Sequence, residues 1–171
     1  MPLIKDGAFI TDSFTRVADA DELPAGAVIV SLSRFLDARE ALLSRDAPLG
    51  VRIGSHETPD ALGPDVHRLA VVELSFPKFR DGRGYSSARV LRDRLGYRGE
   101  VRAVGEVLRD QWLFMRRCGV DAFEVREGTG LEDFRAALGE QTVFYQRTAD
   151  GVPDIFALRQ RQRQSTALAA E

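Results

Sequence analysis

One loop of the sequence gathers residues whose types suit the binding of a small anion. It spans residues 76–89, reads FPKFRDGRGYSSAR, and places two glycines among basic and hydroxyl side chains. Arginine presents forked N–H donors that match the oxygens of phosphate, sulfate or carboxylate. Glycines allow close backbone approach, and a helix that begins beside them would direct free N–H groups at the ligand. We therefore predict an oxyanion site formed by Lys78, Arg80, Asp81, Gly82, Arg83, Gly84, Ser86, Ser87 and Arg89.

The local charge of this region differs from the charge of the whole chain. Residues 78–94 hold six basic and two acidic side chains, a balance of +4, whereas the chain carries −2. A compact positive patch on an acidic protein favours a small anion over a nucleic acid or a membrane surface. The alternative is a solvated helix face with scattered arginines, which suits Arg92 and Arg94 better than Arg80 and Arg83.

Two further interpretations of the loop stay open. The spacing Gly82-x-Gly84-x-x-Ser87 resembles a dinucleotide fingerprint in which Glu106 would hold a ribose, although serine replaces the third glycine. The other interpretation is a structural connector, because ion pairs that only stabilise a fold also cluster. In that case the pairing residues would be Arg80, Asp81, Arg109 and Asp110.

The elements that must position this loop alternate between strands and helices. Short apolar runs predict strands at residues 27–32, 51–54, 69–76, 101–104 and 122–125, and helical periodicity predicts helices at 34–45, 86–95, 107–117 and 131–138. An Asp-Gly turn predicts an N-terminal hairpin, and residues 143–145 suggest a last short strand. The pattern predicts one α/β domain over residues 1–158, a mainly parallel five-stranded sheet with flanking helices. We expect the polar tail at 159–171 to be mobile or a frayed helix.

Four charged residues within the predicted strands bear on the strand order. Arg52, Glu73, Arg102 and Glu124 alternate in sign from one strand to the next. Strands in sequence order would let these charges pair as a ladder, and that order is typical of a partial β/α barrel. A full eightfold barrel needs about 250 residues, more than this chain has. We expect an open sheet, keep the partial barrel as its alternative, and note that charges at strand ends could instead meet water.

Ligands of parallel α/β folds bind where the strands end. This rule adds four residues to the predicted rim of the site, which are His56, Glu106, Arg109 and Asp110. It also places Cys118, the single cysteine, at the opposite end of the sheet, so that we assign it no role as a nucleophile. A lone rim histidine is a poor metal site, so we predict no metal and assign no catalytic residue.

The single cysteine also limits the redox chemistry of one chain. It excludes an internal disulfide and a four-cysteine cluster, and no haem motif is present, so no iron–sulfur cluster or haem is expected. The start MPLIKDG lacks the features of a signal peptide, and no apolar run reaches the roughly 18 residues of a membrane span. We expect a cytoplasmic protein and leave open whether it forms a homo-oligomer.

Residues 76–123 resemble a bacterial family of unknown function. The resemblance rests on FPKFRDGRGYSSARVLRDRLGYRGEVRAVGEVLRDQ and on MRRCGVDAF. Members of that family are described as oxidoreductases involved in sulfite reduction, which implies association with sulfite reductase and phosphoadenylyl-sulfate reductase. The resemblance implies an accessory protein or oxidoreductase subunit of assimilatory sulfite reduction. The alternatives are a non-catalytic anion-binding or docking partner of sulfite reductase, and a phosphate-binding enzyme outside sulfur metabolism. An oxidoreductase would need a flavin, a nicotinamide or an electron-carrying partner.

Overall fold

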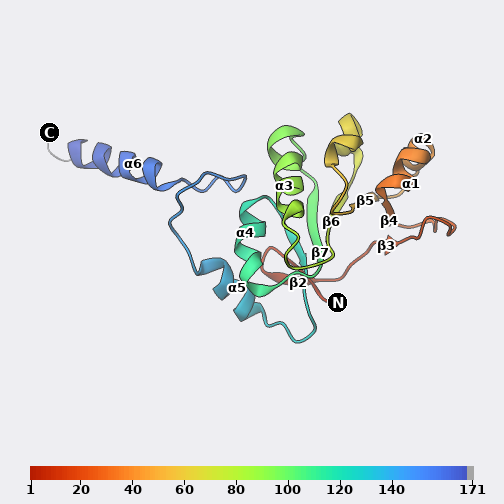
Figure 1. Ribbon diagram of the computed structural model, residues 1–171, viewed down its shortest axis with the longest axis horizontal. Coiled ribbons are helices and arrows are strands. Elements are labelled where there is room, and N and C mark those ends of the chain that lie inside the picture. The colour runs from red at the N-terminus through yellow and green to blue at the C-terminus, as the bar shows by residue number, and fades with distance from the viewer. Residues whose placement is uncertain (169–171) are drawn as a thin grey trace.

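Within residues 1–168, which the computed structural model describes, eight strands form one curled sheet (Figure 1). Its spatial order is β2-β1-β8-β7-β6-β5-β4-β3. Each strand from β3 to β8 runs parallel to its neighbours in that series, whereas β1 pairs antiparallel with both β8 and β2. The strands are β1 (Leu3–Lys5), β2 (Ala8–Ile10), β3 (Thr15–Arg16), β4 (Val28–Ser31), β5 (Leu49–Ile53), β6 (Val71–Phe76), β7 (Glu100–Gly105) and β8 (Ala122–Glu124).

The strand order makes the sheet a half-barrel. The prediction of an open sheet with five parallel strands is wrong, and its alternative, the partial β/α barrel, is confirmed. The five predicted strands correspond to β4–β8, and the predicted hairpin joins the same sheet because β1 pairs with β8. Strand β3 was missed, because two residues are too few to show the periodicity by which a strand is predicted.

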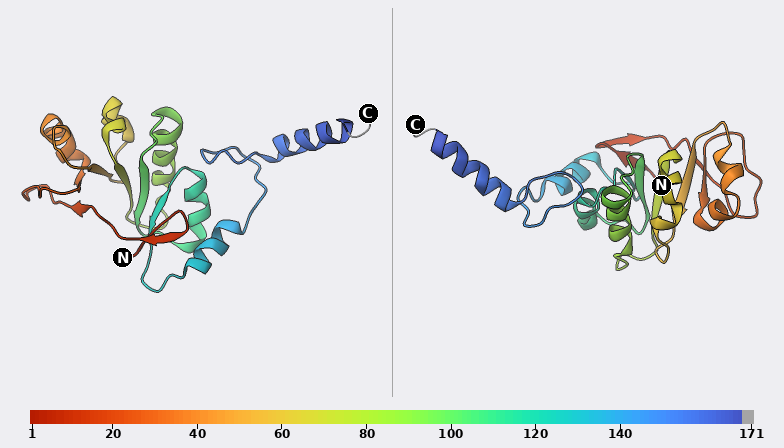
Figure 2. Two further views of the ribbon diagram at one scale, coloured as in Figure 1. Left: turned by 180° about the vertical axis from the view of Figure 1, so that it is seen from behind. Right: turned by 90° about the horizontal axis from the view of Figure 1, so that it is seen from above.

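The helices of the body cover one face of this sheet (Figures 1 and 2). They are α1 (Leu32–Asp37), α2 (Arg39–Leu43), η1 (Pro59–Arg68), α3 (Arg83–Arg89), η2 (Val90–Arg94), η3 (Arg109–Gln111), α4 (Trp112–Arg117) and α5 (Leu131–Gly139). The predicted helix at 34–45 is divided at Ala38, whose backbone leaves the helical region. The helix predicted from residue 86 begins at Arg83, so Ser86 and Ser87 lie inside it and do not cap it.

The core lies between the helices and the face of the sheet that they cover. Strand register places Val51, Val72 and Val101 side by side, and none of these side chains is exposed. Phe35 and Phe134 pack onto this face from α1 and α5 and are also buried. Burial of these apolar side chains is the main contribution to the stability of the fold.

The other face of the sheet is polar and is crossed by the N-terminal chain. Arg52, Glu73 and Arg102 are register partners on three neighbouring strands, and Glu73 and Arg102 are buried. The predicted ladder of charges is confirmed for these three residues, but Glu124 is not its fourth member, because Arg102 is the register partner of Ala122 and Glu124 pairs with Arg16. The interpretation that the charges meet water at strand ends is wrong for Glu73 and Arg102. In Figure 2 the chain between β2 and β3 (red) passes along the side of the sheet away from the helices.

The C-terminal part of the described chain leaves the body. The predicted strand at 143–145 is wrong, because this stretch makes one isolated bridge, from Phe144 to Asp154. Helix α6 (Ile155–Leu168) then projects away from the sheet (Figure 1), and the predicted domain boundary at residue 158 falls inside it. None of the helices described is both long and apolar enough to cross a membrane.

Candidate functional site

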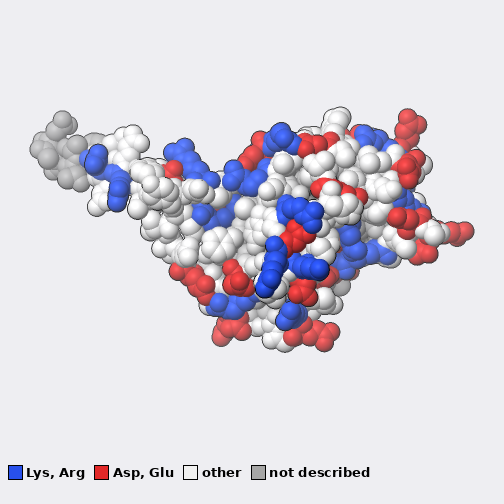
Figure 3. All heavy atoms as spheres, in the orientation of Figure 1, with Lys and Arg blue, Asp and Glu red and all other residues white. Residues whose placement is uncertain are grey.

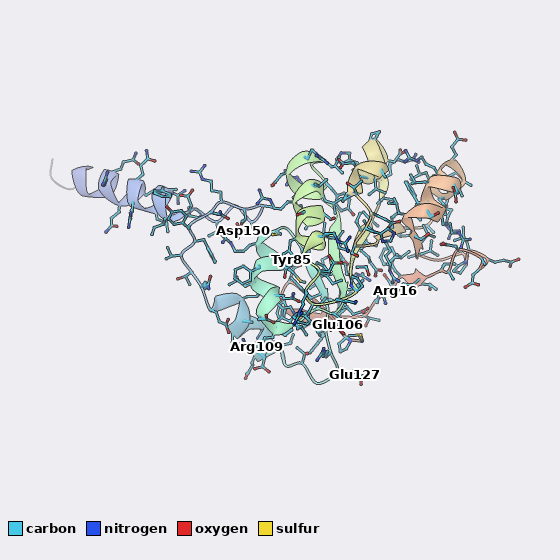
Figure 4. The ribbon with its side chains drawn as sticks, viewed as in Figure 1. Arg16, Tyr85, Glu106, Arg109, Glu127 and Asp150 are labelled. Carbon is cyan, nitrogen blue, oxygen red and sulfur yellow. The ribbon has the colours of Figure 1, made fainter. Side chains whose placement is uncertain are left out.

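The loops that follow β5, β6 and β7 meet at one edge of the sheet, which we call the rim. Arg83 begins α3 and donates from Nη2 to Ser55 Oγ, 3.3 Å away in the loop after β5. Gln111 in η3 donates from Nε2 to the Phe79 carbonyl oxygen at 2.8 Å. Ser55 and Gln111 thus bridge the loops at this edge. Glu106 and Arg109 lie at the same edge (Figure 4).

Two cations of the loop at residues 76–89 are available to a ligand. Lys78 and Arg80 are exposed, and neither pairs with a carboxylate among the residues that the structure describes. The Arg80 guanidinium lies 5.3 Å from the centroid of the exposed Phe79 ring. Basic side chains gather on this face of the molecule (Figure 3). The two unneutralised charges produce a local positive potential that attracts small anions.

A third cation, Arg83, is held by a neighbouring carboxylate. Its Nε lies 2.8 Å from Asp81 Oδ1, and its Nη2 lies 2.7 Å from Asp81 Oδ2. The hydrogen bonds from Arg83 hold the pKa of Asp81 well below its usual range, so that Asp81 stays ionised. This fork-to-fork pair fixes the orientation of the guanidinium and leaves its Nη1 without a partner within the described residues.

The connector interpretation of the loop is wrong in its pairing. Asp81 pairs with Arg83. Arg109 pairs instead with Glu140, with 2.6 Å between Arg109 Nη1 and Glu140 Oε1. No ion pair joins Arg80 to Asp110 within the part of the chain that the structure describes. The rim is therefore not closed by ion pairs between these two loops.

The two glycines of the loop lie in different structural environments. Gly84 is buried, and a Cβ atom there would lie 2.4 Å from Cζ of Phe76. Gly82 has open space around it and a φ of −79°, which any residue can adopt. The packing of α3 against β6 thus accounts for Gly84, which faces the sheet and not a ligand. This removes one support for the dinucleotide interpretation.

Arg89 does not lie with the other residues of the predicted site. It pairs with Asp93 and lines a separate cavity of about 470 Å³ together with Cys118 and Tyr145. Cys118 is half-buried, and this burial raises the pKa of its thiol, which disfavours the reactive thiolate. The structure therefore separates Arg89 and Cys118 from the rim.

Two of the remaining rim residues line a second hollow. Arg109 and Asp110 line a cavity of about 400 Å³ with Trp112, whose buried indole N–H has no acceptor among the residues described. Arg126 stands at the same cavity, 3.8 Å from the carboxylate of Glu106. His56 is exposed in the loop after β5. Within residues 1–168, no group of three or more histidine, cysteine or acidic side chains could hold a metal.

Behind the rim, the polar face of the half-barrel holds a network centred on the buried carboxylate of Glu73. It accepts from Arg16 Nη2 at 2.8 Å, from Arg52 Nε at 2.9 Å, and from Arg102 Nη1 at 3.5 Å. Burial alone would lower the pKa of Arg16, but the carboxylates of Glu73 and Glu124 raise it above its ordinary value. Sequence reasoning found the ladder but missed Arg16 (Figure 4), which reaches it from the two-residue strand β3.

The network continues toward the N-terminal ends of the strands. Arg102 also contacts Asp12 and Glu100, each at 2.8 Å, and its guanidinium lies 5.8 Å from the centroid of the Phe14 ring. Lys5 of β1 donates to the same Glu100 at 2.8 Å. These contacts attach the crossing N-terminal chain to the sheet.

Comparison with known proteins places the chain in a family. A family model described as a bacterial protein of unknown function, DUF934, matches residues 50–156. The matched region begins in β5, ends in α6, and includes the rim loops and the segment at 76–123 that carries the resemblance noted from the sequence. No curated protein and no solved structure gives a significant match. Because the match covers more than half of the sequence, this chain belongs to the DUF934 family of bacterial proteins of unknown function.

Proposed function

We propose that this protein is an oxyanion-binding accessory protein or oxidoreductase subunit of assimilatory sulfite reduction. The observation that carries the proposal is that the exposed Lys78 and Arg80 share one loop with Arg83, whose guanidinium is fixed by Asp81. These cations lie at the carboxyl edge of parallel strands, which is where α/β folds bind their ligands. Sulfite, sulfate and a phosphosulfate group carry the oxygens that such donors recognise.

The way electrons would move is limited by the composition of the chain. One cysteine cannot supply a dithiol or a four-cysteine cluster. A redox role would therefore use a bound flavin or nicotinamide, or electrons from a partner such as sulfite reductase or phosphoadenylyl-sulfate reductase. The second candidate function is a non-catalytic anion-binding protein that docks on sulfite reductase. The unneutralised cations of the rim favour it as much as they favour the first, because anion binding needs no redox group.

Thermal unfolding with added sulfite or sulfate tests the anion site. A ligand that binds only the folded state raises its stability with concentration, so both anions should raise the melting temperature of the wild-type protein. The double variant R80A/R83A should lose this rise and keep the fold, because both side chains are exposed. Unfolding of the double variant without ligand, or an undiminished rise, would contradict the proposed site.

A second double variant serves as the matched control. Arg94 is 60% exposed and pairs with Asp60, much as Arg83 is 62% exposed and pairs with Asp81. Arg68 is exposed at the end of η1, on the opposite edge of the sheet from the rim. R68A/R94A removes the same charge as R80A/R83A and should keep the anion-dependent rise in full.

A visible absorption spectrum of the purified protein separates the two candidate functions. Flavin absorption, or stabilisation by a nicotinamide nucleotide, supports an oxidoreductase subunit. A colourless protein that responds to sulfite but to no nucleotide, and that co-sediments with sulfite reductase, supports the docking partner.

A further inference from the structure

A cavity of about 450 Å³ opens beside the polar face of the half-barrel, where β3, β4 and β5 end. Its charged and polar lining comes from Arg16, Asp19, Ser31 and Arg52, and Ile29 supplies apolar wall. None of these residues belongs to the loop at 76–89, so the cavity is separate from the proposed anion site. Its volume falls in the range of small-molecule sites.

Two guanidinium groups in this cavity are only partly engaged. Arg52 uses Nε on Glu73, which leaves both of its terminal nitrogens without a partner in the described part of the chain. Arg16 uses Nε and Nη2 on Glu73 and Glu124, which leaves its Nη1. The side chains are 40% and 36% exposed, respectively, so a ligand can reach them.

Arg52 is the least constrained of the three guanidinium groups around Glu73. Arg16 and Arg102 already contact this carboxylate, at 2.8 and 3.5 Å. Arg16 also pairs with Glu124, and Arg102 also pairs with Asp12 and Glu100. Arg52 has Glu73 as its single carboxylate partner among the described residues, so its two terminal nitrogens are left without an acceptor. An anion bound in the cavity would supply that acceptor and charge-assisted hydrogen bonds.

The cavity lining also offers an acceptor, Asp19. Ser31 Oγ donates to Asp19 Oδ1 at 2.6 Å and accepts from the Arg34 backbone N–H at 3.0 Å. This leaves Oδ2 of Asp19 without a donor among the residues described. The serine fixes the carboxylate so that its second oxygen can meet a hydroxyl or ammonium group.

We propose that this cavity is a second binding site, which takes a small organic oxyanion that also carries a hydroxyl or ammonium group. Arg52 and Arg16 bind the carboxylate or phosphate oxygens, and Asp19 accepts from the donor group. Ile29 lies beside the carbon chain between the two ends. The site is additional to the rim site and does not depend on it.

Calorimetric titration with two matched carboxylates tests this proposal. L-Malate carries the hydroxyl group that succinate lacks, so the wild-type protein should bind malate more tightly, and D19A should remove the difference. O-Phospho-L-serine tests the phosphate form of the same chemistry. If neither malate nor phosphoserine binds the wild-type protein at millimolar concentration, the cavity is only a structural ion-pair cluster and the proposal is wrong.

The variant R52K measures how much the two terminal nitrogens of the Arg52 guanidinium contribute to malate binding. A lysine can still pair with Glu73 but cannot present two terminal N–H groups, so malate affinity should fall by roughly tenfold or more. R39K is the matched control, because Arg39 is similarly exposed and pairs with Asp65 on the helical face. Unchanged affinity in R52K, or an equal loss in R39K, would overturn the assignment.

Two readouts keep the result interpretable. Changes in amide NMR shift on adding malate to the wild-type protein should concentrate at residues 17–19, 29–31 and 52. This measurement needs no variant, so it does not depend on whether a variant folds. Shifts centred on residues 76–89 would overturn the proposal. The R80A/R83A protein should bind malate normally and fail to respond to sulfite, so the rim proposal and this proposal can fail separately.

Discussion

Four strands lie between the strands of Arg16 and Glu124 in the order of the sheet, yet Nη2 of Arg16 is 2.6 Å from Oε2 of Glu124. Arg16 belongs to the edge strand β3, and Glu124 belongs to β8. Neighbouring strands are about 4.8 Å apart, so a flat sheet would separate these side chains by about 24 Å. The contact is made across the concave face, and it shows that the sheet curls far enough to bring the edge strand β3 within side-chain reach of β8.

Glu73 is the central carboxylate of the network on the concave face. Its removal should lower the stability of the fold more than any other single change in the network. In E73A the buried Arg102 would lose one carboxylate partner, and Arg16 and Arg52 would lose their contacts in the centre of the face. We expect the free energy of unfolding to fall by about 3–5 kcal/mol, as when one partner of a buried ion pair is removed. Urea unfolding measures this loss.

Glu106 provides the control for Glu73. It is exposed, and its carboxylate lies 3.8 Å from Arg126, which is a weak surface pair. E106A should change stability by less than about 1 kcal/mol. Equal effects of E73A and E106A would show that the network contributes little to folding.

The two loop glycines should respond in opposite ways to alanine. In G84A the new Cβ would lie 2.4 Å from the Phe76 ring, so α3 must move off β6, at a cost of about 1–3 kcal/mol. In G82A nothing lies within 4 Å and the backbone is unstrained, so stability should change by less than about 1 kcal/mol. Thermal unfolding of the ligand-free proteins measures both. If G84A is as stable as wild type, Gly84 is not a packing glycine.

The stability of the protein should fall in alkaline solution. Burial raises the pKa of Tyr85 from 10.0 to about 12, so the folded state keeps a proton that the unfolded chain has lost. Where the unfolded state binds fewer protons, the free energy of unfolding decreases as pH rises. The contribution of Tyr85 is therefore intact below about pH 10 and is lost between about pH 10 and 12.

The variant Y85F checks this assignment. Phenylalanine keeps the ring that packs edge-on against Phe76, with ring centroids 5.7 Å apart, and has no proton to lose. Urea unfolding between pH 9 and pH 12 should show a shallower fall for Y85F than for wild type. Burial also raises the pKa of Tyr97, so part of the fall should remain in the variant. Identical slopes would exclude Tyr85 as a contributor.

Much of the fold could be predicted from the sequence, because apolar runs and helical periodicity are local signals. They located β4–β8, and the alternating charges of Arg52, Glu73 and Arg102 indicated the sequential strand order. The curl of the sheet could not be predicted in the same way. It depends on contacts between distant segments, above all those of Arg16, and a two-residue strand has no pattern of its own.

The site was predictable to the extent that it follows from strand ends. The rim loops meet because parallel strands place their carboxyl ends at one edge, so the positions of the strands in the sequence are enough to predict it. The roles of single residues depend on partners far away in the sequence. Gly84 faces Phe76, and Arg89 belongs to another cavity, although both stand beside the loop cations in the sequence. Composition alone could not separate ligand-facing from structural residues.

A variant of Arg92 tests whether structural residues can be told apart from residues of the proposed anion site. Arg92 belongs to the same run of basic residues as Arg80 but is almost fully buried. Its side chain is 11% exposed and donates to three backbone carbonyls and one carboxylate. These acceptors are Gly119 O, Tyr97 O, Gly99 O and Asp121 Oδ2. R92A would leave them unsatisfied, so we expect the free energy of unfolding to fall by about 2–4 kcal/mol.

R80A should have the opposite profile to R92A. Arg80 makes no ion pair among the described residues, so its removal should leave stability within about 0.5 kcal/mol of wild type and weaken the response to sulfite. R92A, examined below its lowered melting temperature, should still respond to sulfite, because Arg92 faces Gly119 and Asp121 and not the rim. Loss of the sulfite response in R92A with unchanged stability would instead indicate that the anion binds near η2, away from the rim.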